Sequence, residues 1–266
     1  MKGAEIVFWK KRTALVTGST RGIGAATARL LAADGAQVVI HGLEETDGEA
    51  LAAELRDAGA AAHFVPADLA DPESPDRLIR RVLELTGRLD VLVNNAGANV
   101  FAGTEAAGLD DWNRCLDLDL RAVWLCSRAA ARVMTGPAAI VNVASNHASA
   151  TMPGIFPYNV AKAGVLALTQ SLAVELATRD IRVNAVCPGY IDTAVNDVYF
   201  GGFPDPAAER ARVDALHPLG RIGNPDAVAR AIRFLASAEE SPFTTGTSLT
   251  VDGGRSALLQ DPPATR

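Results

Sequence analysis

Short apolar segments alternate with helical segments along almost the whole chain, and this alternation restricts the possible folds more than any other feature. The apolar segments are rich in Val and Ile and nearly continuous in hydrophobicity, as strands buried on both faces are. Strands that alternate with helices imply right-handed crossovers and a parallel sheet covered on both faces. The expected strands are Thr13–Thr17, Gln37–His41, Ala62–Pro66, Val91–Asn94, Ala139–Ala144, Arg182–Cys187 and Ser248–Val251.

The chain of 266 residues is predicted to form one doubly wound, Rossmann-type α/β domain over 1–266, with about seven strands. Helix ends are marked by Gly35 as a C-terminal cap, by a capping box that starts at Thr46, and by Ser74 as an N-terminal cap before a proline. The stretch 194–222 is rich in Gly and Pro and is expected to be a substrate lid with one short helix around 207–216.

Composition excludes several classes of protein. The net charge of −6 and pI near 5.3 argue against a nucleic-acid partner, which would favour a basic surface. Three cysteines without a CxxC pair predict neither disulfides nor a zinc site, and no His or Cys spacing suggests another metal. No apolar run approaches the ~18 residues that span a bilayer. We therefore expect a cytoplasmic protein with no membrane partner.

A glycine-rich turn lies between the first expected strand and the first expected helix. Its sequence is Thr17-Gly18-Ser19-Thr20-Arg21-Gly22-Ile23-Gly24. Glycines let the backbone turn sharply and approach a pyrophosphate, and the helix N-terminus adds amide donors and the positive end of a dipole. In this position within a parallel sheet, the turn predicts a dinucleotide site.

Further motifs follow this turn in a fixed order. They are Asp68 after the third strand, Asn94-Asn95-Ala96-Gly97, Ile140 to Ser145, Tyr158-Asn159-Val160-Ala161-Lys162, Pro188-Gly189 with Thr193, and Val251-Asp252-Gly253-Gly254. Together with the glycine-rich turn, they resemble the signatures of the short-chain dehydrogenase/reductase family over nearly the whole chain. The resemblance implies an enzyme that interconverts a secondary alcohol and a ketone by hydride transfer to or from NAD or NADP.

The proposed acid–base residues also fit together on chemical grounds. Tyr158 and Lys162 are four residues apart, so they share one face of a helix. The Lys162 charge should favour the phenolate and lower the pKa of Tyr158, which would then exchange a proton with the alcohol or carbonyl oxygen. The resemblance gives Ser145 the role of holding that oxygen.

One position departs from the family pattern. The family has an asparagine in the helix after the fourth strand, where it supports a water relay to the lysine. Alignment of the segment from Leu116 to Trp124 places Asp119 at that position. An ionised Asp119 near Lys162 would partly neutralise the lysine and raise the pKa of Tyr158. A shifted alignment, or an aspartate turned elsewhere, is the alternative.

The resemblance also implies the cofactor contacts. These are Gly18, Thr20, Arg21, Gly22, Ile23, Gly24, Asp68, Leu69, Asn95, Ala96, Gly97, Tyr158, Lys162, Pro188, Gly189, Ile191 and Thr193.

The choice between NADP and NAD depends on the end of the second strand, where an acid selects NAD. Gly42 stands there, so no acid blocks a phosphate, and Arg21 lies where many NADP-dependent members carry a basic residue. Leu43 at a position often held by arginine, and the acids Glu44 and Glu45, point the other way. The balance favours NADP.

The substrate is the least determined property. A sugar, polyol or small hydroxy compound is the leading expectation, and a 3-oxoacyl thioester is the alternative. Residues expected to reach the pocket are Asn99, Asn146, His147, Tyr190 and Phe200. A nucleotide-binding regulatory protein without turnover is the alternative of another class. By resemblance, helices over Leu109–Met134 and Tyr158–Thr178 would form a homotetramer or homodimer.

Overall fold

A computed structural model describes residues 9–193 and 199–258. Its centre is a parallel sheet of seven strands in the order β3-β2-β1-β4-β5-β6-β7. All seven predicted strands are present, with ends displaced by no more than one residue. Their bounds are β1 Thr13–Val16, β2 Gln37–Gly42, β3 Ala62–Pro66, β4 Val91–Asn94, β5 Ala138–Val143, β6 Ile181–Pro188 and β7 Ser248–Val251.

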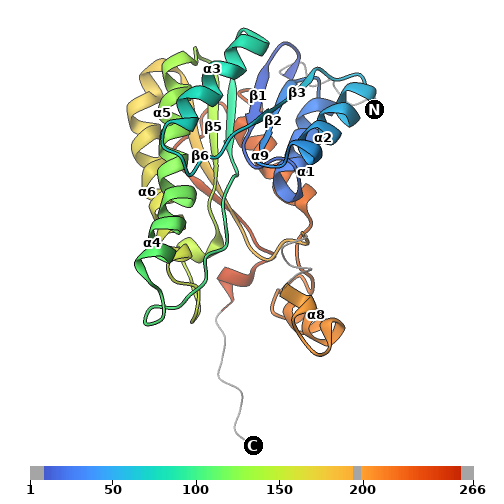
Figure 1. Ribbon diagram of the computed structural model, residues 1–266, viewed down its shortest axis with the longest axis vertical. Helices are drawn as coiled ribbons and strands as arrows, with labels where there is room; N and C mark the ends of the chain where they lie inside the picture. Colours follow the sequence, from blue (N-terminus) through green and yellow to red (C-terminus); the bar gives the residue numbers. More distant parts are fainter. Residues whose placement is uncertain (1–8, 194–198, 259–266) are drawn as a thin grey trace, which may run out of the picture.

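Helices cover both faces of the sheet (Figure 1). One face carries α1 (Gly22–Ala33), α2 (Glu45–Asp57) and α9 (Pro225–Ala236). The other carries α3 (Ser74–Thr86), α4 (Leu109–Leu116), α5 (Ala122–Val133) and α6 (Tyr158–Leu176). Two apolar cores result, one between the sheet and each helical layer. The doubly wound fold is therefore confirmed.

The strand order reverses between β1 and β4, which are neighbours in the sheet although β2 and β3 lie between them in sequence. In open parallel sheets, ligands bind beyond the carboxyl ends of the strands at such a reversal. The glycine-rich turn follows β1, and Asn95 follows β4. The fold thus brings these two motifs together.

Two predicted helix starts are wrong by one or two residues. Helix α3 begins at Ser74 itself, because the Ser74 hydroxyl bonds Asp71 Oδ2 (3.1 Å) instead of capping the helix. Helix α2 begins before Thr46, with Glu44 at the N-cap. The predicted cap at Gly35 is confirmed, since this residue follows α1 with φ of +99°.

The helix predicted over Leu109–Met134 is not continuous. A π-helical turn, Asp117–Arg121, separates α4 from α5. Such a turn contains one extra residue per turn and re-aims the side chains that it carries, and it occurs often at functional sites. Here it faces α6, to which Gly164 allows close approach: a Cβ on Gly164 would lie 2.8 Å from Leu120.

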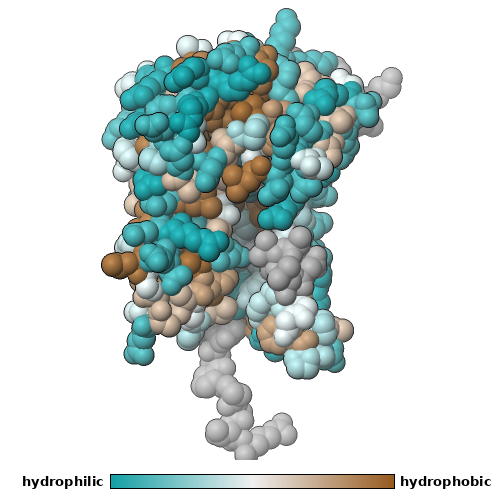
Figure 2. All heavy atoms as spheres, in the orientation of Figure 1, coloured by the Kyte–Doolittle hydropathy of each residue, from teal (hydrophilic) through white to brown (hydrophobic). Residues whose placement is uncertain are grey.

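Helix α6 with the short 3₁₀ turn after it, Tyr158–Arg179, is long and apolar enough to match a membrane span by composition. Its buried residues pack against the sheet beside β6, so its apolar character is that of a core helix. Figure 2 shows mainly hydrophilic side chains over the outer helices, with hydrophobic ones gathered in the hollow between the two halves of the molecule.

The expected lid over 194–222 begins in residues outside the described part of the chain. Its predicted helix is present as α8, Pro206–Ala215, capped by the Asp205 side chain, which accepts the Ala208 N–H. Helix α8 lies apart from both helical layers (Figure 1). Arg210 on α8 forms two hydrogen bonds with Asp192, of 2.9 and 2.7 Å, and these tie the helix to the segment after β6.

Candidate active site

The turn after β1 depends on residues without a side chain. Gly18 and Gly22 have φ of +59° and +57°, a region that L side chains rarely adopt. A Cβ on Gly18 would lie 2.7 Å from Ala96 Cα, and one on Gly24 would lie 2.4 Å from the Gly18 carbonyl oxygen. The turn is therefore packed tightly against the end of β4 and leads into the N-terminus of α1, where Arg21 makes no side-chain cap.

Asn95 holds this turn in place. Its side-chain amide donates to the carbonyl oxygens of Thr17 (3.0 Å) and Gly18 (2.8 Å). The Thr17 hydroxyl in turn accepts the backbone N–H groups of Asn95 and Ala96, both at 3.0 Å. The side chain of Asn95 thus holds the loop that is predicted to bind the cofactor.

Beneath the site, a chain of buried amides connects the two central strands to the helices of one face. Asn94 donates to Asn142 (2.8 Å) and to Ser127 (2.9 Å), and Asn142 donates to Thr169 on α6 (2.9 Å). Asn142 was not singled out from the sequence. Its signal is a polar residue inside an otherwise apolar strand, which must find partners when it is buried.

His41, at the end of β2, was also missed as a site residue. It is buried, and its Nδ1 accepts the Gly18 N–H (3.1 Å) while Nε2 lies 3.1 Å from the Ala67 carbonyl oxygen. Because a backbone N–H can only donate, Nδ1 is unprotonated and Nε2–H donates to Ala67. Burial lowers the pKa of His41 to about 4, so it is a neutral link between three loops.

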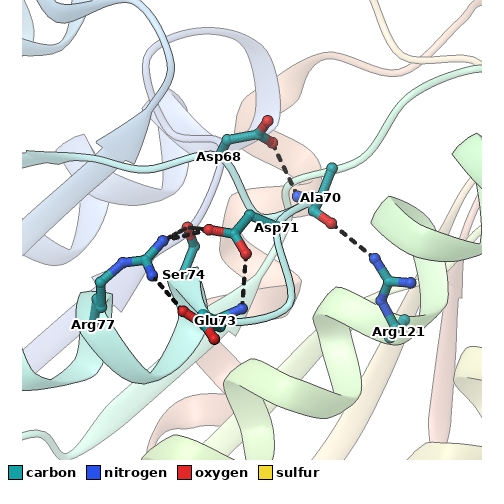
Figure 3. A network of polar contacts seen from close by, with 7 residues as sticks. All are labelled: Asp68, Ala70, Asp71, Glu73, Ser74, Arg77 and Arg121. Carbon is teal, nitrogen blue, oxygen red and sulfur yellow. Dashed lines mark hydrogen bonds and ion pairs between the residues drawn. The ribbon is translucent and has the colours of Figure 1, made fainter.

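Asp68 lies in the loop after β3, where the resemblance places an adenine contact. Its Oδ1 accepts the Ala70 N–H (2.9 Å), as Figure 3 shows. The Ala70 carbonyl oxygen accepts a hydrogen bond of 2.8 Å from Arg121, the last residue of the π-turn. The loop that carries Asp68 is thereby fastened to the turn that carries Asp119.

Tyr158 begins α6, and the Ser145 side chain lies close enough to lower the pKa of its phenol. Ser145 follows β5 and caps the next element, a short 3₁₀ helix, by accepting the His147 N–H (3.1 Å). The Tyr158 ring meets the Phe101 ring edge-on, with centroids 5.2 Å apart, and the His147 ring at 6.4 Å. Ser145 and Tyr158 therefore meet as expected, with an aromatic ring on each side of the tyrosine.

Lys162 lies one turn after Tyr158 and is almost fully buried. Its Nζ donates to the Val143 carbonyl oxygen (3.2 Å), lies 5.5 Å from the Tyr158 ring centroid and is 3.0 Å from Asp119 Oδ1. The aspartate thus faces the lysine, which excludes the alternative of a carboxylate turned elsewhere. Burial lowers the pKa of Lys162, but Asp119 and Tyr158 raise it by more, and the ammonium form is stabilised.

The pKa of Tyr158 differs from the expectation. Burial raises it, Lys162 and the Ser145 hydrogen bond lower it, and Asp119 raises it further. The net direction is upward, whereas the lysine alone was expected to bring it down. Desolvation of the phenolate outweighs a cation whose charge a neighbouring carboxylate offsets. Without a bound cofactor, the protonated phenol form of Tyr158 is therefore favoured.

A cavity of 730 Å³ connects all these groups. Every predicted cofactor contact lines it except Gly24, which is buried behind the turn, and Ser145 and Asp119 line it as well. Asn99, His147 and Tyr190 are on its wall as expected. Phe200 is not: it packs with Val213 and Ile222 under α8. The neighbouring Tyr199 takes the place on the wall.

The end of the cavity that lies away from Tyr158 carries side chains of both charges. Arg21 lines it beside Gly42, where a Cβ would lie 2.5 Å from Thr20 Cγ2. Glu44 and Asp47 line the same end. A dinucleotide fits this arrangement, because glycines leave room for a pyrophosphate at the N-terminus of α1 and the cavity continues from there to Tyr158.

Comparisons with known proteins agree with this geometry. The family described as "Enoyl-(Acyl carrier protein) reductase" matches residues 18–256. The chain is 45% identical to a cis-4-hydroxycyclohexanecarboxylate dehydrogenase of Sinomonas cyclohexanicum, over 93% of this chain and 98% of that relative. It is 39% identical to a 3-oxoacyl-[acyl-carrier-protein] reductase of Synechocystis, over 91% and 96%.

It is also 39% identical to 3beta-hydroxysteroid dehydrogenase 1 of Eggerthella lenta, over 92% of this chain and 94% of that relative. Among solved structures, it resembles a short-chain dehydrogenase/reductase of Serratia marcescens. The TM-score is 0.87 at 34% identity, over 94% of this chain and 99% of that one.

Proposed function

Since the chain belongs to the short-chain dehydrogenase/reductase family of NAD(P)-dependent oxidoreductases, we propose that Ser145, Tyr158 and Lys162 are the residues with which it interconverts an alcohol and a ketone. The observation that carries this proposal is the contact of Tyr158 with both Ser145 and Lys162 on the wall of one cavity. Asp119 is connected to these residues by its ion pair with Lys162.

Each of these residues has a distinct task in the proposed mechanism. In reduction, the Tyr158 hydroxyl gives its proton to the carbonyl oxygen, and in oxidation the phenolate takes the proton of the alcohol. Ser145 donates a hydrogen bond that holds the reacting oxygen beside Tyr158. The nicotinamide of the cofactor, when bound, supplies or accepts the hydride. Lys162 stabilises the phenolate form of Tyr158 with its positive charge.

We assign the binding of the cofactor to the residues that line the far part of the cavity. The pyrophosphate would lie at the turn from Gly18 to Gly22, and the adenosine would lie near Asp68 and Leu69. The NADP preference rests on Arg21 and on the lack of an acid at Gly42, while Glu44 and Asp47 weaken it.

The substrate that fits best is a small hydroxy compound or its ketone. Near Tyr158, the cavity wall combines the apolar side chains of Phe101, Met152 and Ile155 with the polar groups of Asn99 and Tyr190. A sugar would place several hydroxyls against the apolar part, at a cost in hydrogen bonds. The relatives named for a hydroxycyclohexanecarboxylate and a hydroxysteroid act on ring compounds, which supports this choice.

A 3-oxoacyl thioester is the second candidate, supported by the relative named as a 3-oxoacyl-[acyl-carrier-protein] reductase. A panel of substrates separates the candidates. Purified protein would be assayed with NADPH and NADH against cyclohexanone, 4-oxocyclohexanecarboxylate, acetoacetyl thioesters and, in the oxidative direction, sorbitol. We expect turnover of the cyclic ketones. Faster turnover of the thioesters would favour the second candidate, and turnover of sorbitol alone would contradict the assignment.

We propose a cytoplasmic homotetramer built on the helical face that contains α4, α5 and α6. Leu109 and Val174 are both 79% exposed, and Trp124 is half exposed on the same elements. The three cysteines are free and buried, as suits a reducing compartment. Light scattering tests the assembly, and a stable monomer at micromolar concentration would contradict it.

A further inference from the structure

Asp119 forms a buried ion pair with Lys162 at the wall of the cavity. The aspartate side chain is 0% exposed and that of the lysine 5%, and Oδ1 lies 3.0 Å from Nζ. A buried carboxylate needs partners that compensate for the loss of water. Lys162 and two further donors surround this one.

Two donors besides Lys162 face the carboxylate. The Ala98 backbone N–H is 3.3 Å from each carboxylate oxygen, and the Cys115 thiol is 4.0 Å from Oδ2. Burial and the adjacent Asp119 raise the pKa of Cys115 to about 12, so the thiol keeps its proton and remains a donor. All three neighbours of the Asp119 carboxylate are therefore hydrogen-bond donors.

The backbone is shaped to permit this pair. Asp119 reaches Lys162 from the π-turn, which interrupts α4 and α5 at this point. Gly97 leaves the space that the carboxylate occupies, since a Cβ there would lie 2.4 Å from Asp119 Oδ1 and 3.3 Å from Lys162 Nζ. The ion pair therefore depends on two backbone features, the π-turn at Asp119 and the missing side chain at Gly97.

The pair changes the charge that Tyr158 experiences. The groups that face Tyr158 and Lys162 are Cys115 from α4, Asp119 from the π-turn, Ser145 and His147 after β5, and Cys187 at the end of β6. Lys162 is the one cation of this set, because burial and Arg255 lower the pKa of His147. The Asp119 carboxylate, 3.0 Å from Lys162, therefore offsets the effect of this cation on Tyr158.

We propose that Asp119 is a positioning residue that acts through Lys162 to keep Tyr158 protonated well into alkaline solution. Reduction of a carbonyl, which needs the phenol, then extends over a wide pH range that includes neutrality. Oxidation of an alcohol, which needs the phenolate, reaches its full rate only at alkaline pH. The inference rests on the proposed role of Tyr158 as the acid–base group.

The substitution Asp119→Asn tests the charge with little change of size. We expect the pH of half-maximal kcat/KM for alcohol oxidation to fall by about one unit, the size typical of a nearby charge. The alkaline limb of carbonyl reduction should move down with it. Asp117→Asn is the matched control, because it removes a carboxylate from the same turn that pairs with Arg121 at the surface. Its profile should match that of the wild type.

An unchanged pH profile in folded Asp119→Asn would overturn the proposal. Circular dichroism checks the fold. A second measurement needs neither turnover nor that variant: the near-ultraviolet difference titration of wild type against Tyr158→Phe reports ionisation of this tyrosine. We expect it above the ordinary value of about 10, and ionisation at or below that value would refute the proposal. Absence of turnover with every substrate would instead refute the proposed function, leaving the titration informative.

Discussion

The imidazole of His41 accepts a hydrogen bond from the backbone N–H of Gly18, 3.1 Å away, and so joins the end of β2 to the turn after β1. The opposite nitrogen lies 3.1 Å from the Ala67 carbonyl oxygen. One neutral side chain thus holds three segments around the adenosine end of the cavity, and only the neutral form can accept from Gly18.

This relationship predicts a pH dependence of stability. The pKa of His41 falls from its ordinary value near 6.5 to about 4 in the folded protein, so the unfolded chain binds more protons between these values. Its contribution is complete above about pH 6.5 and is lost as the pH falls toward 4, by an amount on the order of 3 kcal/mol.

Denaturant unfolding at pH 7 and pH 4.5 checks this contribution. We expect His41→Gln to lose less free energy of unfolding between the two pH values than the wild type does. His63→Gln, in the neighbouring strand β3, is the control and should behave like the wild type. Equal losses in wild type and His41→Gln would show that His41 is not the titrating group.

A second prediction concerns Gly24. Its Cβ in Gly24→Ala would lie 2.4 Å from the Gly18 carbonyl oxygen and 2.6 Å from Asn95 Nδ2. The turn and α1 must therefore separate, and we expect a loss of about 1–3 kcal/mol in stability together with weaker binding of both nucleotides. Gly201→Ala, where no atom lies within 4 Å of the added carbon, should change neither property.

A third prediction is that Arg21 sets the preference for NADPH over NADH. We expect Arg21→Ala to weaken NADPH binding about tenfold, the loss of one charged hydrogen bond to a phosphate, and to leave NADH binding unchanged. Fluorescence titration with each nucleotide measures both affinities. Arg114→Ala, an exposed arginine on α4 outside the cavity, is the control. Stronger binding of NADH than of NADPH by the wild type would show that Glu44 and Asp47 dominate this end.

The fold was predictable because its determinants are local and ordered. Each apolar run is bounded by turn residues, and parallel strands must meet at their carboxyl ends. Ser145 and Tyr158 were therefore brought together by topology as soon as their elements were recognised. The family resemblance assigned Arg21, Asp68 and Thr193 to the cofactor, and all three line the same cavity.

Details that depend on long-range packing were not predictable. The π-turn that aims Asp119 at Lys162 has no signature in the helical pattern of this segment. Phe200 was assigned to the cavity although it packs beneath α8, because neighbouring aromatic residues cannot be distinguished before their backbone is placed. The net pKa direction of Tyr158 required the burial of the phenol, which the sequence does not contain.

Replacement of Tyr158 by Phe tests the central claim most directly, since it removes one hydroxyl and keeps the ring beside Phe101 and Lys162. We expect kcat/KM for the ketone to fall by at least about 100-fold, as for the loss of a general acid, while the affinity for the nucleotide stays within about twofold. Tyr199→Phe, which removes a hydroxyl that donates to Glu209 (3.0 Å), should retain most activity. A Tyr158→Phe enzyme with activity near that of the wild type would contradict the account.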